Sequence, residues 1–312
     1  MSRPLLSIVI ANYNYGRFLE EAIRSVIVQD IGDKVELIIC DAASTDNSVE
    51  IIKKYANGLP PNTAYDEWAL QPPNHQTTKP SNQLVTWWCS ESDGGQSAAF
   101  NKGFSHSRGR FLTWLNADDV MLPGTLKKFE AAIERHPKCE WFVGGCLWLS
   151  KEMRVIQCRR AAPMSRIQLK AGQLVVWGPS SFFTRRMFES VGGVDERFFY
   201  TMDSELWHKF AYVLGARYKV MADYAWGLRL HEDAKMSGQN FDESQRDPNH
   251  PRWKKIEQEV EWMMVHYRPK HGMTRLKRIL SVHYFRAILS RCDTLRFRGL
   301  GYADACKGMG LK

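Results

Sequence analysis

The chain has 312 residues, 44% of them hydrophobic, which is enough for one large or two small domains with a sizeable core. Its 7 cysteines form no CxxC pair, so neither a disulfide scaffold nor a structural zinc site is expected. No run of about 18 apolar residues occurs, and the start MSRPLLSIVIANYN lacks a signal-peptide pattern. We therefore expect a cytoplasmic protein without a membrane-spanning helix.

The formal net charge of +9 is unevenly distributed along the chain. Residues 251–312 carry 14 Lys and Arg against 5 Asp and Glu, whereas residues 1–250 carry 29 of each kind. No RNA-binding or DNA-binding motif accompanies this basic tail. Nucleic acid is therefore not an expected partner.

Strands and helices alternate from the amino terminus. Residues 7–11 (SIVIA) and 35–40 (VELIIC) are apolar and β-branched, which predicts two buried strands. Between them, apolar residues recur at helical spacing, and a second helical segment follows Asp41. This alternation predicts an α/β fold with a doubly wound, mainly parallel sheet. The residues at helical spacing are Phe18, Ala22, Ile23, Val26 and Ile27.

Residues 57–83 differ in composition from the segments on either side. Prolines at 60, 61, 72, 73 and 80 interrupt every helical or strand period, so this stretch is predicted to be an extended loop inserted into the domain. It would serve either as a flap on the acceptor side of a site or as a passive surface loop.

Acidic residues follow the next apolar run directly. Residues 110–115 (RFLTWL) predict a buried strand, and Asn116, Asp118 and Asp119 come immediately after it. In open α/β sheets ligands bind at the carboxyl ends of the strands. Oxygen ligands there suit Mg²⁺ or Mn²⁺ bridging a diphosphate. The alternative is an ordinary polar turn.

Six segments in chain order carry a family resemblance that covers about residues 4–235. Together they resemble the family 2 glycosyltransferases, inverting enzymes of the GT-A fold that use nucleotide sugars. The resemblance implies a GT-A domain over residues 1–235 and leaves residues 236–312 as a basic helical extension. The segments are SIVIANYN, DAASTDNS, SESDGGQSAAFNKGF, FLTWLNADD, GPSSFFTRRMFESVGGVDERF and MDSELWHKF.

The resemblance implies that Asp203 is the catalytic base that takes the proton of the acceptor hydroxyl. Asp203 opens a helical segment in which Leu206, Phe210, Val213 and Leu214 form the expected buried face. The alternative is a helix-terminal aspartate favoured by the helix dipole, with Glu205 as the fallback base. Met202 stands where the family often has a glutamate.

The resemblance also implies a set of metal ligands. Asp118 matches the last acid of the family's DxD motif, and Asn116 replaces the first acid, which removes one charge but keeps an oxygen. Asp119 is either a second ligand or a brace for the loop. His231 follows another predicted strand and is either a further ligand or a structural histidine.

Two further groups of residues are implied by the resemblance. In the nucleotide-sugar group, Asp41 and Asp93 are expected to contact the nucleotide base or the ribose, and the alternative for Asp41 is capping of the next helix. Lys102 is expected either to contact the phosphates or to lie in solvent. In the second, Trp177 would stack on an acceptor sugar or serve as a core or lid residue. The nucleotide-sugar group is Ala11, Tyr13, Asn14, Asp41, Asp93, Asn101, Lys102, Asn116 and Asp118, and the acceptor group is Trp177, Gly178 and Ser180.

The basic tail contains two helical patterns, over residues 253–267 and from 274 to about 291, separated by RPKHG. In the second pattern an apolar stripe is flanked by Arg and Lys residues. Such a helix has two possible roles. It either binds the anionic inner surface of the cell membrane or packs its apolar stripe on the domain. The stripe is Leu276, Leu280, Tyr284 and Ile288.

Three functions are compatible with these features. The leading one is metal-dependent hexosyl transfer from a nucleotide sugar, with UDP as the default carrier, to a glycan or lipid-linked saccharide in surface polysaccharide synthesis. The second is a sugar nucleotidyltransferase, which normally has a glycine-rich basic loop after its first strand that ANYNYGRF does not supply. The third is a catalytically silent glycan-binding protein on the same fold.

Overall fold

The computed structural model describes residues 3–29, 34–57, 85–164, 169, 174, 176–235, 251–267 and 282–311, with side chains from residue 289 onward in the last range. The first half of the described chain contains β1 (Leu6–Asn12), α1 (Gly16–Ile27), β2 (Val35–Asp41), α2 (Ser48–Ala56), β3 (Val85–Ser90), α3 (Gln96–Ser105), β4 (Phe111–Asn116), β5 (Val120–Met121) and α4 (Thr125–Arg135). The second half contains β6 (Trp141–Leu149), β7 (Val155–Arg159), η2 (Gly178–Ser180), β8 (Ser181–Thr184), α6 (Arg185–Ser190), α7 (Met202–His208), η3 (Lys209–Val213), β9 (Lys219–Arg229), α8 (Pro251–Tyr267), α10 (Val282–Phe297) and α11 (Tyr302–Gly308).

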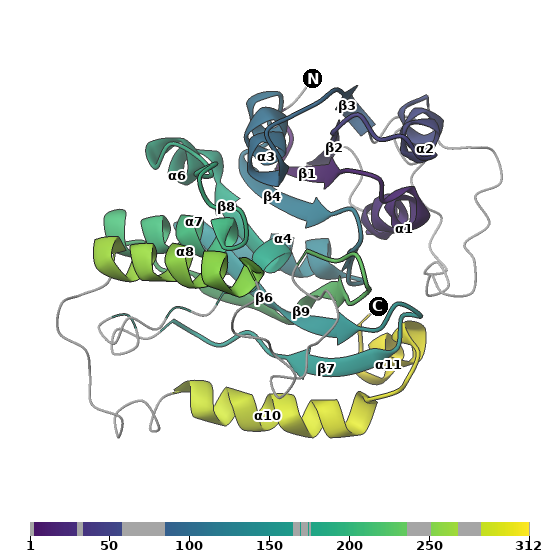
Figure 1. Cartoon of the computed structure of the whole chain (residues 1–312). Coiled ribbons are helices and arrows are strands. Elements are labelled where there is room, and N and C mark those ends of the chain that lie inside the picture. Colours follow the sequence, from purple (N-terminus) through teal and green to yellow (C-terminus); the bar gives the residue numbers. More distant parts are fainter. Residues whose placement is uncertain are drawn as a thin grey trace.

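One twisted sheet of nine strands organises the described chain, in the order β3-β2-β1-β4-β8-β6-β9-β5 with β7 paired to β6 (Figure 1). The β1–β2, β1–β4, β2–β3 and β6–β9 pairs are parallel, whereas β8 runs antiparallel to both β4 and β6. The predicted doubly wound, mainly parallel α/β sheet is confirmed. The three strands predicted from their apolar runs correspond to β1, β2 and β4.

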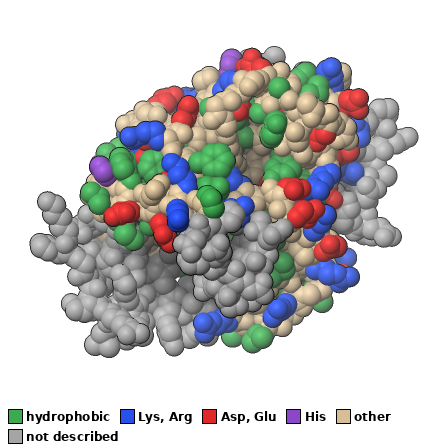
Figure 2. All heavy atoms as spheres, viewed as in Figure 1, with side chains coloured by type: hydrophobic (Ala, Val, Ile, Leu, Met, Phe, Trp, Pro, Cys, Tyr) green, Lys and Arg blue, Asp and Glu red, His purple; other side chains and the backbone are tan. Residues whose placement is uncertain are grey.

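Each face of the sheet is covered by helices. Along β1, Ile8 and Ile10 join the cluster that includes α1, α2 and α4, while Val9 joins the cluster on the opposite face with α3, α6 and α7. This alternation follows from the two-residue period of a strand and explains the continuous apolar run in the sequence. The face of described residues drawn in Figure 2 carries Lys and Arg interspersed with Asp and Glu.

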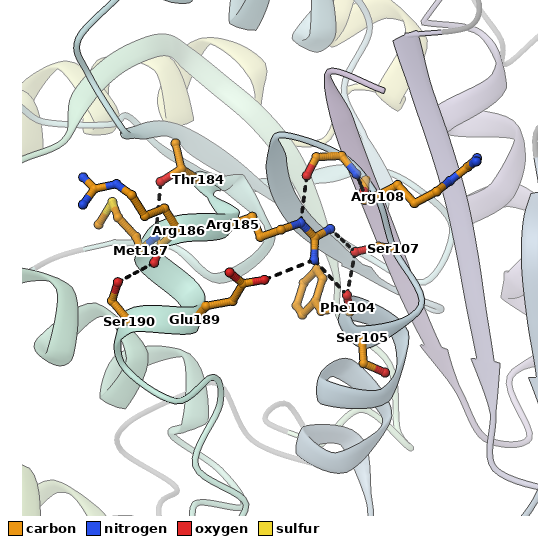
Figure 3. Close-up of polar contacts among 12 residues, drawn as sticks. Phe104, Ser105, Ser107, Arg108, Thr184, Arg185, Arg186, Met187, Glu189 and Ser190 are labelled. Atoms are coloured by element: carbon orange, nitrogen blue, oxygen red, sulfur yellow. Dashed lines mark hydrogen bonds and ion pairs between the residues drawn. The ribbon is translucent and has the colours of Figure 1, made fainter. Parts of the chain in front are cut away.

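A partly buried arginine joins α6 to the loop that leads into β4 (Figure 3). The Arg185 guanidinium donates hydrogen bonds to the backbone oxygens of Phe104 (3.2 Å) and Gly109 (3.1 Å) and to Ser107 Oγ (2.6 Å). Because burial removes water from this cation, the pKa of Arg185 is lowered. These contacts fix the end of α3 and the start of β4, the strand that carries Asn116 at its other end.

The helix that begins at Met202 differs from the sequence prediction in its second half. Leu206 and Phe210 are fully buried as expected, but Val213 and Leu214 are 61% and 38% exposed. Residues Lys209–Val213 form a π-helix, with Leu214 N–H donating to Lys209 O at 3.1 Å. The wider turn rotates the following residues away from the face that a regular helix would bury.

The carboxy-terminal helices pack on the domain, α8 against α7 and α10 against the sheet. The predicted helix 253–267 is confirmed as α8, and α10 runs along β7 (Figure 1). Backbone N–H groups of Cys158 and Arg160 donate to Thr294 Oγ1 (2.9 Å) and Ser290 Oγ (3.0 Å) of α10. The helix predicted over residues 274 to about 291 corresponds to α10, which is described from Val282 onward. It ends at Phe297, later than predicted. The loop 58–83 and the four side chains of the apolar stripe lie outside the described residues.

None of the described helices combines the length and the apolar character needed to cross a membrane.

Candidate active site

The acidic motif lies at the carboxyl end of β4, as predicted. Asn116 pairs with Ala11 of β1 in the parallel ladder, so the ends of both strands meet at one edge of the sheet. Asp119 N–H donates to Asn116 O at 3.1 Å, which closes a tight turn and places Asp118 at its tip. Only three residues separate the end of β4 from the start of β5, so the chain has to turn sharply between the two strands.

Asp118 and His231 lie together at this edge. His231 Nε2 lies 3.0 Å from Asp118 Oδ2; the His231 side chain is fully buried, and that of Asp118 is 13% exposed. The imidazole ring lies over Phe18 (centroid distance 4.6 Å) and edge-on to Tyr15 (5.5 Å), so it is held in one orientation. Two of the three predicted metal ligands are thus brought together by β4 and β9.

Asp119 points in another direction. Its Oδ1 accepts a hydrogen bond from Arg229 N–H (2.9 Å) and its Oδ2 accepts one from Asn116 Nδ2 (2.7 Å). Burial raises the pKa of Asp119 well above its ordinary value, and the neighbouring Asp118 carboxylate adds to the rise. Of the two roles left open by the sequence, this geometry favours the brace over the ligand.

Among the described residues no three His, Cys, Asp or Glu side chains are grouped closely enough to hold a metal ion. The chain offers one carboxylate oxygen and one imidazole nitrogen, from Asp118 and His231. Such a pair fits a divalent ion only if the remaining ligands come from water or substrate. Mixed oxygen and nitrogen donors suit Mn²⁺ better than Mg²⁺, which prefers oxygen ligands alone.

A chain of hydrogen bonds reaches the same turn from two residues that sequence reasoning missed. Lys235 Nζ donates to Gln96 Oε1 (3.0 Å), Gln96 Nε2 donates to Asn116 Oδ1 (3.0 Å), and Asn116 in turn bonds Asp119. Burial lowers the pKa of Lys235 to about 8. Gln96 stands within the quoted DGGQ segment and was open to prediction, whereas Lys235 has no motif around it.

Asp203 lies in the first turn of α7, as predicted. Its Oδ1 accepts a hydrogen bond from the N–H of Ser204 (2.6 Å). Its surroundings displace water from the carboxylate, which raises the pKa of Asp203. A β-carbon placed on Gly178 would lie 3.3 Å from Asp203 Oδ2 and 3.7 Å from the Trp226 ring. The predicted base and the predicted acceptor segment are therefore adjacent.

Glu205, the fallback base, is engaged elsewhere. Its side chain is fully buried, accepts a hydrogen bond from Tyr267 Oη (2.6 Å) and forms an ion pair with Lys209 (3.1 Å). Burial raises its pKa as well, but its contacts join α7 to α8 rather than to the acceptor segment. Asp203 is the carboxylate that faces Gly178.

A glutamate of α8 positions the start of α7. Glu259 is 5% exposed and accepts hydrogen bonds from the N–H groups of Phe199, Tyr200 and Thr201 (2.9, 3.0 and 2.9 Å) and from Thr201 Oγ1 (2.9 Å). A carboxylate on free N–H groups ahead of a helix is a strong arrangement, because each bond is assisted by charge. It fixes the backbone that leads to Asp203.

The predicted nucleotide residues fall into three settings. Tyr13 is 61% exposed beside the edge. Asp41 is 1% exposed, and its oxygens accept hydrogen bonds from Asn12 Nδ2 (2.6 Å), Ser44 Oγ (2.5 Å), Ser44 N–H (3.0 Å) and Ser90 Oγ (2.6 Å). Asn14 Oδ1 accepts from Thr45 N–H (2.8 Å) and Asp93 Oδ1 from Gly95 N–H (2.7 Å), so both hold neighbouring loops.

Three other predicted residues have their polar groups engaged within the chain. The Asn101 side chain makes two hydrogen bonds with the backbone of Val194. Its Nδ2 donates to Val194 O (2.9 Å), and its Oδ1 accepts from Val194 N–H (3.0 Å). Lys102 pairs with Glu91 (2.9 Å). Ser180 is fully buried and donates to Gly144 O (2.8 Å). These contacts favour structural roles for Asn101, Lys102 and Ser180.

The family model of glycosyl transferase family 2 matches residues 7–67 and 88–192. The chain belongs to this family, which confirms the family resemblance seen in the sequence.

Two curated relatives extend the comparison. An uncharacterised glycosyltransferase of Nostoc sp. (strain PCC 7120) is 35% identical over 123 residues, which cover 39% of this chain and 31% of that protein. One of Mycobacterium tuberculosis (strain H37Rv) is 28% identical over 207 residues, 65% of this chain and 68% of that protein. The matched region is thus less than a third of the Nostoc protein.

Solved structures show the same fold. The S. aureus TarS 1–349 structure in complex with UDP-GlcNAc has a TM-score of 0.56 at 16% identity and covers 85% of this chain and 68% of that one. The mannosyltransferase PcManGT from Pyrobaculum calidifontis, in complex with GDP-Man and Mn²⁺, has a TM-score of 0.54 at 16% identity and covers 99% and 76%.

Proposed function

We propose that the chain transfers a sugar, with inversion, from a nucleotide sugar to a hydroxyl group of a glycan or lipid-linked saccharide. The observation that carries this proposal is the pairing of two sites along the described sheet edge. Asp118 and His231 form one, and Asp203 against Gly178 forms the other. Membership of glycosyl transferase family 2 supports the reaction class.

Asp203 would act as the general base. An inverting transfer needs one carboxylate that accepts the proton of the attacking hydroxyl as the bond to the anomeric carbon forms. The raised pKa of Asp203 makes it a better proton acceptor than an ordinary aspartate, and the N–H of Ser204 holds its other oxygen in place. Gly178 leaves room beside Oδ2 for the acceptor hydroxyl.

Asp118 and His231 would hold the diphosphate end of the donor through Mn²⁺ or Mg²⁺. A bound divalent ion would neutralise the charge that develops on the departing nucleoside diphosphate. The buried ring of His231 and the tight turn at Asp118 would fix these two ligands before substrate arrives. The Mn²⁺ complex of the mannosyltransferase supports this choice of metal.

The donor and acceptor classes rest on relatives. We take UDP as the carrier to test first, because the TarS structure was solved with UDP-GlcNAc. A match of 131 residues to the minor teichoic acid biosynthesis protein GgaB of Bacillus subtilis, 29% identical, supports surface polysaccharide synthesis as the setting. That match covers 42% of this chain and 12% of GgaB.

Calorimetric titration of UDP, GDP and TDP, with Mn²⁺ and with a chelator, tests the proposal. Binding of one nucleotide that depends on Mn²⁺ is expected. Equal binding with Mn²⁺ and with chelator would contradict the metal site, and no binding to any nucleotide would contradict the transferase proposal in favour of a silent fold.

We extend the proposal to an anionic membrane surface reached through the basic tail on the cytoplasmic side. Since α10 and α11 pack on the sheet, replacing Arg275, Lys277 and Arg278 by serine tests this better than truncation. The triple variant should sediment less than the wild-type protein with vesicles containing phosphatidylglycerol. Equal sedimentation of the two proteins would contradict the membrane contact.

A further inference from the structure

Arg159, the last residue of β7, lies between two tryptophans. Its guanidinium carbon is 4.9 Å from the centroid of the Trp148 ring and 5.8 Å from that of Trp177. The two rings meet edge to face at 6.5 Å. All three residues are partly buried, and the two rings pack against the core cluster that contains Trp226.

Among the described residues, Arg159 has no carboxylate or carbonyl partner. Its Nε is buried and makes no hydrogen bond. The next residue shows the contrast, because Arg160 forms ion pairs with Asp293 and Asp223, both at 2.6 Å. A partly buried guanidinium is normally paired, since the loss of water around it is costly. Within the part of the chain that the structure describes, the Arg159 donors are therefore open to a further group.

The position of Arg159 connects it to the catalytic carboxylate. Arg159 pairs with Cys146 of β6, and Cys146 pairs with Trp226 of β9, so the three side chains form one row across neighbouring strands on the same face. Trp226 lies against Gly178, which in turn lies against Asp203. Trp177 precedes Gly178 directly. Two strand spacings, roughly 10 Å, separate the backbone of Arg159 from that of Trp226.

We propose that Arg159, Trp148 and Trp177 form a subsite for a saccharide acceptor that bears an anionic group, a phosphate or a carboxylate. The proposal rests on the proposed function. Tryptophan faces give a flat apolar surface for the C–H groups of a sugar ring, and the planar guanidinium presents two parallel N–H donors that match either anion. The anionic group would belong to a sugar unit next to the one that reacts at Asp203.

The test compares three sugars of similar size by calorimetry, with the protein saturated in UDP and Mn²⁺. The probes are glucose, glucose 6-phosphate and glucuronate. At least one charged sugar should bind about tenfold or more tightly than glucose, as expected for a charge-assisted pair. The charged sugar that binds more tightly identifies the source of the anion. Equal affinities for all three would overturn the subsite.

Two variants separate the contributions of charge and stacking. Arg159→Gln should remove the advantage of the charged sugar while UDP affinity stays at the wild-type value, and Trp177→Ala should weaken all three sugars. Arg135→Gln, a change of the same kind on the exposed face of α4, should leave every affinity unchanged. A retained advantage in Arg159→Gln would overturn the proposal. Absence of UDP binding by the wild-type protein would instead contradict the proposed function.

Discussion

His231 Nε2 lies 3.0 Å from Asp118 Oδ2, although the two residues are 113 positions apart in the chain. β4 and β9 end at one edge of the sheet and bring the two residues together there. Arg17 lies on the other side of the imidazole, with Nη2 3.5 Å from Nδ1, and is itself held by Asp233 and Glu232. This supported pair is the basis of the first prediction.

Replacing His231 by glutamine should weaken the Mn²⁺-dependent part of UDP binding by about tenfold or more, equivalent to about 1.4 kcal/mol. The amide keeps the hydrogen bond to Asp118 but supplies no imidazole nitrogen to a metal. Titration calorimetry with and without Mn²⁺ measures the difference. His266→Gln, on the exposed face of α8, is the control. An unchanged Mn²⁺ dependence would mean that His231 only positions Asp118.

The two acids of the turn should separate function from stability. Asp119→Ala removes the acceptor of the hydrogen bonds from Arg229 N–H and Asn116 Nδ2, so the free energy of unfolding should fall by about 1–3 kcal/mol. Asp118→Ala removes a partly exposed carboxylate that pairs with His231 Nε2, so the free energy of unfolding should fall less than in Asp119→Ala, while diphosphate binding with Mn²⁺ weakens. Urea unfolding and calorimetry on both variants provide the comparison. The reverse pattern would exchange the two roles.

The pH dependence of turnover should reflect the environment of Asp203. As a general base Asp203 acts only when ionised, so the rate should fall as pH drops through its raised pKa, above the range of an ordinary aspartate. The Lys235 ammonium lowers this pKa and burial raises it. Lys235→Met removes the positive charge and should therefore move the acid limb of kcat to higher pH.

Lys254→Met, an exposed change on α8, is the control for the pH profile. Asp203→Asn should abolish turnover with metal-dependent UDP binding retained. An acid limb that stays in place in Lys235→Met would show that Asp203 does not set it.

Glu259→Gln tests whether α8 supports the site. The neutral amide turns a charge-assisted acceptor into a weaker one, and its NH₂ group faces N–H donors, so unfolding should become easier by about 1–3 kcal/mol. Turnover should fall more than UDP affinity, since the Asp203 backbone shifts while the Asp118 turn does not. The neighbouring exposed Glu261→Gln should behave as wild type. Equal loss of turnover and UDP affinity would contradict this separation.

The sequence predicts the parts of this site that depend on local pattern. The apolar runs up to Ala11 and Leu115 predict β1 and β4, so the polar residues that follow them are expected at the strand ends. Leu206 and Phe210 follow the helical period. Val213 departs from it because the π-helix depends on tertiary packing, which spacing along the chain does not encode.

Residues that act over long sequence separations are harder to predict. From the sequence, Glu259 is predicted to be an exposed charged residue of an amphipathic helix. In the structure it accepts four hydrogen bonds from the residues that precede α7. The lowered pKa of Lys235 likewise comes from burial, which composition around it does not reveal. By contrast, Asp203 and His231 were open to prediction through motif and strand position.

The direction of β8 has a consequence for how acceptor preference varies. Because β8 is antiparallel to β4, residues 177–180 reach this edge of the sheet just before a strand begins, whereas Asp118 and His231 follow strands that end there. Insertions or deletions ahead of Trp177 can therefore reshape the proposed acceptor side, while the strand register that holds the proposed donor side stays intact. Acceptor choice and donor chemistry can diverge separately in such a chain.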